Sequence, residues 1–392
     1  MTELFFDPDR ISTVMDQAEA EALIAVTPPN IQYLTGYRRG GDALAVLRRS
    51  DLAHPELIVG ASNIDYCLED LCNGVNVQAF GVFYRDFTGG VELTEREGFV
   101  REVHNRTKKE ASRWELMAEH LYSNHLKTSR IGTDASLETI APLSKLLPGL
   151  EMQSLPDLFK RLRMVKTPQE ISRMAEAARV TEHAILTSAY SAIQGTTQRQ
   201  LSRLYNLTAI AANCSIRSDN ASIGRGSALG NLNSPLDVVE EGSILRFDVG
   251  VFYEGYASDV ARTFVFRKMG EKERRYHAAL VAGLERELEL IKPGAVACEI
   301  FHAAMETVHR AGIPHYQRHH VGHGLGIAGA GYEPPLLGPA DQTVLEPGMA
   351  LCVETPYVEL GFGGLHPEDM LVVTEDGYRL LTHSERNLRI LP

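Results

Sequence analysis

Apolar residues recur at helical spacing in several long segments of the chain. The clearest segment starts at Thr167, with Pro168 at the first helical position and Glu170 three residues after the threonine. This is the pattern of a capping box, in which the hydroxyl and the acid satisfy backbone N–H groups at the helix start. Apolar residues follow at positions 171, 174, 175 and 178, and we expect the helix to end near Gly195.

Three further segments have the same spacing and recognisable ends. They lie at about residues 113–126, 270–291 and 297–311. Pro293 and Gly294 end the second segment, and Gly312 ends the third. The second segment carries an apolar stripe made of Tyr276, Leu280, Leu284, Leu288 and Ile291. This stripe predicts a helix face that is buried in the core.

Residues 244–250 and 256–265 are rich in β-forming side chains and predict a hairpin with its turn at Glu254-Gly255. With the turn there, Asp248 lies opposite Ala261, and Asp259 is its diagonal neighbour on the same face. Diagonal neighbours lie about 7–8 Å apart at the backbone. Their carboxylates can therefore converge on two metal ions about 3.5–4 Å apart.

A second pair of strands is predicted at residues 349–358 and 365–374, separated by the glycine-rich segment 361–364. Glu354 and Glu368 stand in these strands directly beside core-type runs, and His323 stands among the glycines of residues 322–326. Each of these residues alone is more often a hairpin carboxylate or a loop histidine than a ligand. Buried carboxylates are costly unless they are paired or bind a metal. Together with Asp248 and Asp259 they therefore predict a polynuclear metal site.

The order and spacing of these motifs resemble those of the pita-bread metallohydrolases, the superfamily of methionine aminopeptidase, aminopeptidase P, prolidase and creatinase. The matching segments are residues 247–250, 255–264, 322–326, 346–354 and 368–369, and a weaker match lies at residues 25–37. The resemblance implies an α+β protein of two domains. Residues 1–160 would form a creatinase-like α/β domain, and residues 161–392 a pita-bread domain, which is a curved antiparallel sheet with flanking helices.

The resemblance also implies roles for the five residues. Asp248 would hold one metal ion, His323 and Glu354 would hold the other, and Asp259 and Glu368 would bridge the two. Glu354 would in addition accept the proton of the attacking water. Carboxylate-rich ligation favours Mn or Co, with Zn and Fe as alternatives. Relatives with this layout imply a homodimer.

Three positions depart from the family pattern. The histidine expected seven residues after the metal histidine is Ala330, and a second histidine expected upstream of the first aspartate is Asn233. The arginine expected two residues before the last glutamate is His366. These groups position substrate and move protons in the relatives. We therefore expect Xaa-Pro dipeptides to be poor substrates.

Side chains near the motifs can take over these tasks. We predict His366 and His319 as catalytic groups together with Glu354, and we predict Arg318, Arg225 and Asn233 as substrate-binding groups. The spacing of His366 to Glu368 places both on one strand face. For His319 and the neighbouring His320, an ordinary position satisfied by backbone partners is an equal alternative.

These residues favour metal-dependent hydrolysis of an amide or peptide-like bond in a small molecule or short peptide. A lyase or another repurposed enzyme acting on a small carboxylate metabolite is the alternative, because the same ions could stabilise a carboxylate or an enolate. A non-catalytic binding module would not need all five ligands. Residues 324–329 also fit the pattern G-x-G-x-x-G, but Gly331, Pro334 and Pro335 follow in place of a helix, so dinucleotide binding is not expected.

Composition agrees with a two-domain enzyme. The 392 residues are 44% hydrophobic, enough for two cores, and the net charge of −12 argues against nucleic acid or an anionic membrane as partner. The five cysteines have no zinc-type or redox spacing and suit reduced thiols. The acidic start of the sequence contains Pro8, unlike a secretory signal, so we expect a cytoplasmic protein.

Overall fold

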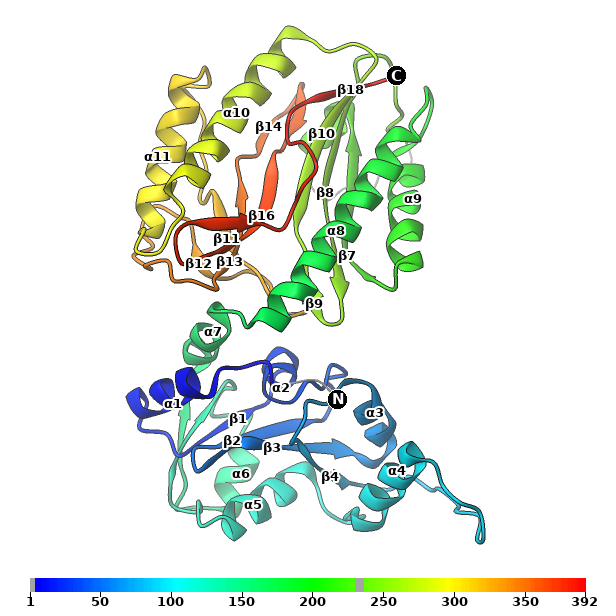
Figure 1. Ribbon diagram of the computed structural model, residues 1–392, viewed down its shortest axis with the longest axis vertical. Helices are drawn as coiled ribbons and strands as arrows, with labels where there is room; N and C mark the ends of the chain where they lie inside the picture. The colour runs from blue at the N-terminus through cyan, green and yellow to red at the C-terminus, as the bar shows by residue number, and fades with distance from the viewer. Residues whose placement is uncertain (1–3, 230–235) are drawn as a thin grey trace. The chain divides into compact units, whose positions relative to one another are not determined.

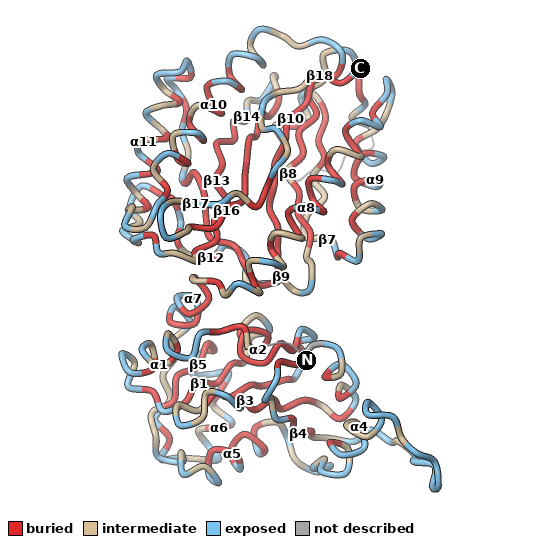
Figure 2. Tube along the Cα trace, in the orientation of Figure 1, coloured by how far each residue is buried: buried red, intermediate tan, exposed pale blue. Residues whose placement is uncertain are grey.

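The computed structural model describes residues 4–229 and 236–392 and divides the chain into two compact units, Met1–Arg163 and Met164–Pro392. Each unit combines helices with its own sheet structure (Figure 1). The strands are buried along most of their length, whereas the helices alternate between buried and exposed positions (Figure 2). The predicted α+β class is confirmed.

The first unit contains one mixed six-stranded sheet with the strand order β4-β3-β2-β1-β5-β6. Its elements are α1 Pro8–Gln17, β1 Ala22–Ala25, α2 Pro28–Thr35, β2 Leu44–Arg48, β3 Asp51–Gly60, η1 Ala61–Tyr66, α3 Cys67–Asp70, β4 Asn76–Phe80, α4 Glu95–Arg106, α5 Arg113–Ser123, β5 Arg130–Thr133, α6 Ala141–Leu146, β6 Glu151–Ser154 and α7 Pro156–Met164. Helix α5 confirms the helix expected at residues 113–126, and a capping box formed by Ser112 and Glu115 starts it.

The second unit contains two five-stranded sheets and a two-stranded ribbon, β14–β15. Its elements are α8 Pro168–Tyr190, α9 Gln198–Ala211, β7 Ser215–Ile223, η2 Gly224–Ala228, β8 Ile244–Tyr253, β9 Tyr256–Ala257, β10 Val260–Phe266, α10 Glu271–Leu290, α11 Ala297–Arg310, β11 Gly322–Gly324, β12 Glu333–Leu336, β13 Ala350–Glu354, β14 Tyr357–Glu359, β15 Gly363–Leu365, β16 Glu368–Val373, β17 Tyr378–Leu380 and β18 Arg389–Leu391. One sheet has the order β18-β10-β8-β7, with β9 paired to β8, and the other has the order β12-β11-β13-β16-β17.

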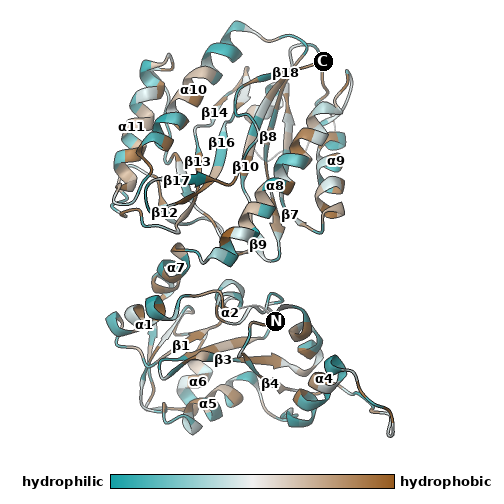
Figure 3. Ribbon diagram, in the orientation of Figure 1, coloured by the Kyte–Doolittle hydropathy of each residue, from teal (hydrophilic) through white to brown (hydrophobic). Residues whose placement is uncertain are grey.

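Four helices cover these sheets in two pairs (Figure 1). Helices α8 and α9 pack on the sheet of β7 and β8, and α10 and α11 pack on the sheet of β11, β13 and β16. Each helix carries hydrophilic and hydrophobic positions along its length, as expected for a helix with one covered face (Figure 3). The predicted starts and stripes are confirmed: Thr167 and Glu170 form the capping box of α8, and the stripe from Tyr276 to Ile291 is buried.

The predicted hairpin of β8 and β10 has the expected register, with Asp248 paired to Ala261. Between β9 and β10 the chain leaves the ladder at Ser258 and Asp259. The Ser258 hydroxyl lies 2.9 Å from the backbone N–H of Val251 and accepts its hydrogen bond. Asp259 therefore lies in the break between β9 and β10, and the buried Ser258 hydroxyl stabilises this break.

The long strand expected at residues 349–358 is wrong as a single element, because it breaks after Glu354 into β13 and β14. The strand expected at residues 365–374 is confirmed as β16, which begins at Glu368, whereas Leu365 ends β15. The two breaks contain Pro356 and Pro367. Proline has no N–H group for the ladder and is disfavoured inside a central strand. Strands β13 and β16 pair with each other, and β14 and β15 form a separate two-stranded ribbon.

Candidate metal centre

The five predicted ligand residues come together in the second unit from five points of the two large sheets. Asp248 lies on β8, Asp259 precedes β10, His323 lies on β11, and Glu354 and Glu368 end β13 and begin β16. Glu354 and Glu368 are directly paired across the two strands. All five except Asp248 are buried, and the side chain of Asp248 is 33% exposed.

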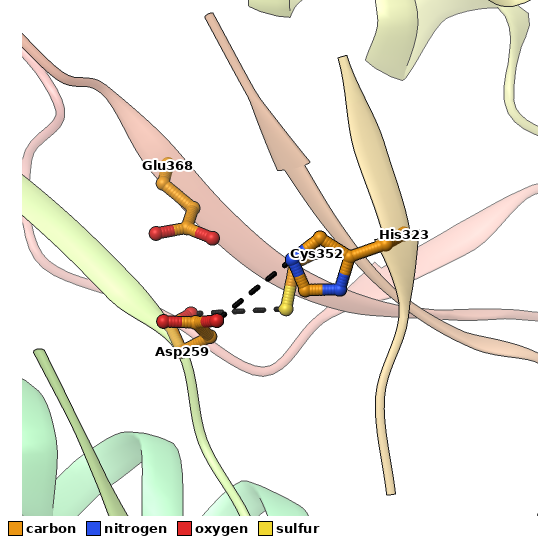
Figure 4. A group of neighbouring side chains, drawn as sticks. All are labelled: Asp259, His323, Cys352 and Glu368. Atoms are coloured by element: carbon orange, nitrogen blue, oxygen red, sulfur yellow. Dashed lines mark hydrogen bonds and ion pairs between the residues drawn. The ribbon is translucent and has the colours of Figure 1, made fainter. Parts of the chain in front are cut away.

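The donor atoms fall into two groups that share Glu368. Asp259, His323, Cys352 and Glu368 form one group, and Glu354, His366 and Glu368 form the other. Within each group all donor atoms lie within 4.8 Å of one another. Figure 4 shows the first group, with His323 and Cys352 facing Asp259. Among the described residues Asp248 belongs to neither group, and its Oδ2 lies 3.6 Å from Nδ1 of His366.

His323 is prepared to act as a ligand. Its Nδ1 lies 3.1 Å from the carbonyl oxygen of Gly324 and donates to it, so the Nε2 lone pair is free. Nε2 lies 3.8 Å from Oδ2 of Asp259. Burial lowers the pKa of His323 to about 4, so the ring is neutral near pH 7. The neighbouring Gly322 is required for this packing, because a Cβ there would lie 2.4 Å from the carbonyl oxygen of Cys352.

The electrostatics of the first group fit a cation. Burial, followed by the charges of Asp259 and Glu354, raises the pKa of Glu368 well above its ordinary value. Burial also raises the pKa of Asp259 to about 6, although Arg217 opposes the shift. Within the described residues, Oε2 of Glu368 is buried without a hydrogen-bond partner. A divalent cation would satisfy this oxygen, and carboxylate and imidazole donors suit Mn, Fe, Co or Zn.

Glu354 is held through both of its carboxylate oxygens. Nδ1 of His320 lies 3.1 Å from Oε1, Nη2 of Arg318 lies 3.4 Å from the same oxygen, and Nε2 of His366 lies 2.9 Å from Oε2. Burial alone would raise the pKa of Glu354, but His320 and His366 hold it well below the ordinary value. Conversely, Asp248 and Glu354 raise the pKa of His366 against the effect of burial. These contacts favour the ionised form of Glu354 and the protonated form of His366.

The predicted catalytic and substrate residues differ in how they relate to this centre. His366 and Arg318 contact Glu354 as described. His319 is exposed and packs its ring against His320, with the ring centroids 4.3 Å apart, so the histidine that reaches Glu354 is His320. The expectation for His319 is corrected in this respect, because His319 lies at an exposed bend and His320 is buried beside Glu354.

The remaining predicted residues lie further from the ligands or cannot be placed. Arg225 is exposed on η2 beside Gly361, and within residues 4–229 and 236–392 no ion pair joins it to the five ligands. Asn233 lies outside the described residues. Ala330 lies in a turn, whereas Tyr332, which directly precedes Glu333, stacks on the His323 ring at 3.7 Å between centroids. The side chain that packs on His323 is therefore Tyr332 and not the expected position 330.

Two arginines of the centre have no sequence motif that marks them. Nη1 of Arg217 lies 2.8 Å from Oδ1 of Asp259, and Nη2 of Arg246 lies 3.9 Å from Oδ2 of Asp248. The pairing of β7 with β8 shifts by one residue between Ile216 and Ser218, which leaves Arg217 as the extra residue of a β-bulge. Bulges redirect side chains, so sequence spacing alone does not reveal that Arg217 faces the centre.

We expect Arg217→Met to destabilise the metal-free protein by about 3–5 kcal/mol, because Asp259 then stays buried without its cationic partner. A bound divalent ion would take over the neutralisation, so the variant should gain more stability from added metal than the wild type does. Thermal unfolding with chelator and with metal measures both effects. Arg286→Met, which breaks an exposed pair with Glu289, is the control and should change stability by less than about 1 kcal/mol. Equal metal stabilisation of the Arg217 variant and the wild type would contradict the prediction.

The chain is similar to known metallopeptidases. The family model described as Metallopeptidase family M24 matches residues 172–375. A Xaa-Pro dipeptidase of Lactobacillus helveticus is 27% identical over 286 residues, which cover 71% of this chain and 77% of the relative. A Xaa-Pro dipeptidase of Pyrococcus horikoshii is 24% identical over 390 residues, which cover 97% of both chains.

A solved structure extends the likeness to both units. The crystal structure of an X-Pro aminopeptidase from Thermotoga maritima superposes with a TM-score of 0.78 at 19% identity, covering 98% of this chain and 99% of that one. This confirms the expected two-domain pita-bread architecture. Among the described residues, no helix is both long enough and apolar enough to span a membrane.

Proposed function

The chain belongs to metallopeptidase family M24 and is a metal-dependent hydrolase, and on this premise we propose that it cleaves an amide bond in a small peptide-like substrate with two divalent ions. The observation that carries the proposal is the pair of donor groups that share Glu368. A carboxylate common to two adjacent groups suits a dinuclear centre. Asp259, His323 and Glu368 would hold one ion, and Glu354 and Glu368 would hold the other, with Asp248 at its side. This differs from the family resemblance, which placed Glu354 with His323 and had Asp259 bridge the ions.

The residues around Glu354 supply the proton transfers. When bound, two divalent ions act as Lewis acids that polarise an amide carbonyl and make water a stronger nucleophile at neutral pH. Glu354, which is ionised, accepts the proton of the attacking water. His366, whose pKa Asp248 and Glu354 raise and whose Nε2 lies 2.9 Å from Glu354, would donate toward the leaving nitrogen and would then not bind an ion. Arg318 and His320 keep the Glu354 carboxylate in place.

The substrate side of the centre supports a specificity that differs from that of the named relatives. Those relatives are Xaa-Pro dipeptidases. In this chain the positions expected to carry their accessory groups are Ala330, Asn233 and His366. Tyr332 covers the outer face of His323 and is 56% exposed, so it presents an aromatic surface to a substrate. We propose that Arg318, and Arg225 from η2, hold a substrate carboxylate.

We expect the metal-loaded enzyme to hydrolyse N-acyl amino acids or dipeptides without proline faster than Xaa-Pro dipeptides. Accessory acid–base groups contribute about 10²–10⁴-fold to rate, so their loss should keep Xaa-Pro turnover low. A panel of Xaa-Pro dipeptides, other dipeptides and N-acyl amino acids, assayed with Mn and Co, measures this. A kcat/KM for any Xaa-Pro dipeptide above about 10⁴ M⁻¹s⁻¹ would show that the replaced groups are dispensable.

A lyase acting on a small carboxylate metabolite is the second candidate, favoured by the same replaced positions. The two reactions differ in their products, because only hydrolysis places solvent oxygen in a carboxylate. Running the reaction in ¹⁸O-labelled water and weighing the product by mass spectrometry separates them. We propose Mn or Co as the native ions and the cytoplasm as the location.

We propose a homodimer as the working form. Its solution mass is expected near twice the 43.3 kDa of one chain. The first unit exposes several large apolar side chains between β4 and α4, and burial on a second copy would remove them from water. These side chains are Val82, Phe83, Tyr84, Phe87 and Val91. Light scattering at micromolar concentration measures the mass, and a value near 43.3 kDa would overturn this proposal.

A further inference from the structure

The first donor group contains a thiol in addition to the oxygen and nitrogen donors of the proposed function. Cys352 lies on β13 directly opposite His323 on β11, so the two side chains share one face of the sheet. Cys352 is also two residues from Glu354, which places it on the same face one step further into the core. The β-sheet register therefore turns the thiol toward the ligands.

The thiol is close to every other donor of the group. Sγ of Cys352, Nε2 or Nδ1 of His323 and one oxygen each of Asp259 and Glu368 all lie within 4.8 Å of one another (Figure 4). The four residues are at most 5% exposed. Sγ of Cys352 lies 3.9 Å from the backbone carbonyl oxygen of Asp259, a long and weak hydrogen bond. The sulfur of Cys352 thus lies among the donor atoms of the group, and its hydrogen bond to Asp259 is too weak to compete with a metal ion.

Two further observations, independent of the cysteine, point to a cation at this place. Oε2 of Glu368 is buried and has no hydrogen-bond partner among the described residues. Nε2 of His323 is left free because Nδ1 donates to Gly324. In addition, Arg217 occupies Oδ1 of Asp259, so this carboxylate offers only its other oxygen to an ion. The group then supplies one sulfur, one nitrogen and two carboxylate oxygens.

We propose that Cys352 is a thiolate ligand of the metal ion held by Asp259, His323 and Glu368. Four donors of this composition match the coordination number and ligand types of zinc, and they also suit cobalt(II) and iron(II). Manganese and magnesium, which prefer oxygen donors, are disfavoured at this position, so the Mn of the proposed function would occupy only the position beside Glu354. On binding, the Sγ–H bond breaks, the sulfur lone pair forms the bond to the ion, and the proton leaves to solvent. The inference rests on the proposed dinuclear centre and deepens it by assigning chemically different ions to its two positions.

Cobalt(II) is the probe for this assignment, because a cobalt–thiolate bond gives a near-ultraviolet charge-transfer absorption that oxygen and nitrogen ligands do not give. The full-length protein is stripped with chelator, loaded with cobalt(II), and its bound metal is measured by elemental analysis. We expect the absorption in the wild type and in Cys298→Ser, a control that removes a half-exposed thiol on α11. We expect it to be absent in Cys352→Ser. X-ray absorption of the zinc-loaded wild type should show a sulfur at about 2.3 Å beside the lighter ligands at about 2.0–2.1 Å.

The outcomes separate this inference from the proposed function. If cobalt binds to the wild type but the charge-transfer absorption is absent, or persists in Cys352→Ser, the thiolate assignment is wrong while the dinuclear centre stands. If neither cobalt nor zinc binds, the proposed function fails with it. Should Cys352→Ser fail to fold, the zinc–sulfur distance in the wild type decides alone, and a shell of only light atoms overturns the assignment.

Discussion

Glu368→Gln is expected to lower hydrolysis by about 10³-fold or more, because the carboxylate that both donor groups share is lost and Lewis-acid catalysis is worth several kcal/mol. The same variant should bind less metal at both positions. Elemental analysis after loading and dialysis, together with initial rates on the best substrate of the panel, measures both effects. Glu375→Gln, at an exposed position just after β16, is the matched control and should behave as the wild type.

Loss of activity in this variant should not come with loss of stability. Glu368 is a buried carboxylate whose pKa is raised, so its ionised form costs folding free energy at neutral pH when no metal is bound. Glutamine has the same shape without the charge. The unfolding temperature of metal-free Glu368→Gln should therefore equal or exceed that of the metal-free wild type. A clear decrease would mean that Glu368 supports the fold rather than a metal ion.

The pH dependence of the metal-free protein follows from the same carboxylates. Asp259 titrates near pH 6 in the folded state, above its ordinary value of 3.8, so the folded state holds this proton more tightly than the unfolded state. The cost of its charge therefore develops as pH rises from about 4 to about 6 and is complete above that. The free energy of unfolding of the metal-free protein should therefore fall as pH rises from about 4 to about 6. Added metal should abolish this fall.

Arg262→Met is expected to destabilise the protein by about 3–5 kcal/mol, the usual cost of breaking a buried charge network by removing one partner. Arg262 is 1% exposed. Its Nη2 lies 2.7 Å from Oδ1 of Asp369 and 3.2 Å from Oε1 of Glu182, and its Nε lies 2.9 Å from Oγ of Ser384. It also donates to the backbone carbonyl of Glu368. One guanidinium thus joins α8, β10, β16 and the C-terminal segment beneath the centre.

Denaturant unfolding measures this change, with Arg274→Met as the control. Arg274 pairs with Glu271 at the surface and is 63% exposed, so its removal should change the free energy of unfolding by less than about 1 kcal/mol. A loss below about 1 kcal/mol for Arg262→Met would contradict the view that the network holds Glu368 in place. Partial retention of metal binding in the Arg262 variant would be compatible with it, because the ligands themselves are unchanged.

The parts of the fold that follow local rules were predictable from sequence. The capping box at Thr167 and Glu170 and the turn at Glu254-Gly255 each involve residues within four positions of one another, and both are as expected. The turn in turn sets the register that pairs Asp248 with Ala261. Pro356 and Pro367 are an equally local signal, because proline interrupts a β-sheet ladder. These two prolines mark the breaks between β13 and β14 and between β15 and β16.

The parts of the site that depend on irregular backbone were not predictable. His319 and His320 are adjacent in a segment without regular structure, so no periodicity shows which of them faces Glu354. Arg217 reaches Asp259 through a bulge, and Tyr332 reaches His323 through the turn that precedes β12. Cys352 is a different case. Its position two residues before Glu354 placed it on the ligand face, but a single cysteine in an apolar run is usually a packing residue.

The breaks at Pro356 and Pro367 separate the β14–β15 ribbon from the sheet that contains β13 and β16. The ribbon shares no ladder with β13 or β16, and it is attached by contacts of its own: Glu359 pairs with Lys272 at 2.7 Å, and the N–H of Gly364 donates to Oγ of Ser227 on η2 at 2.7 Å. The exposed ribbon positions Val358 and Leu360 can therefore change without shifting the register that sets Glu354 against Glu368. Gly363 and Gly364 lie too close to η2 to accept a side chain. Substitution at the two exposed positions offers a route to new substrate preferences on an unchanged metal scaffold.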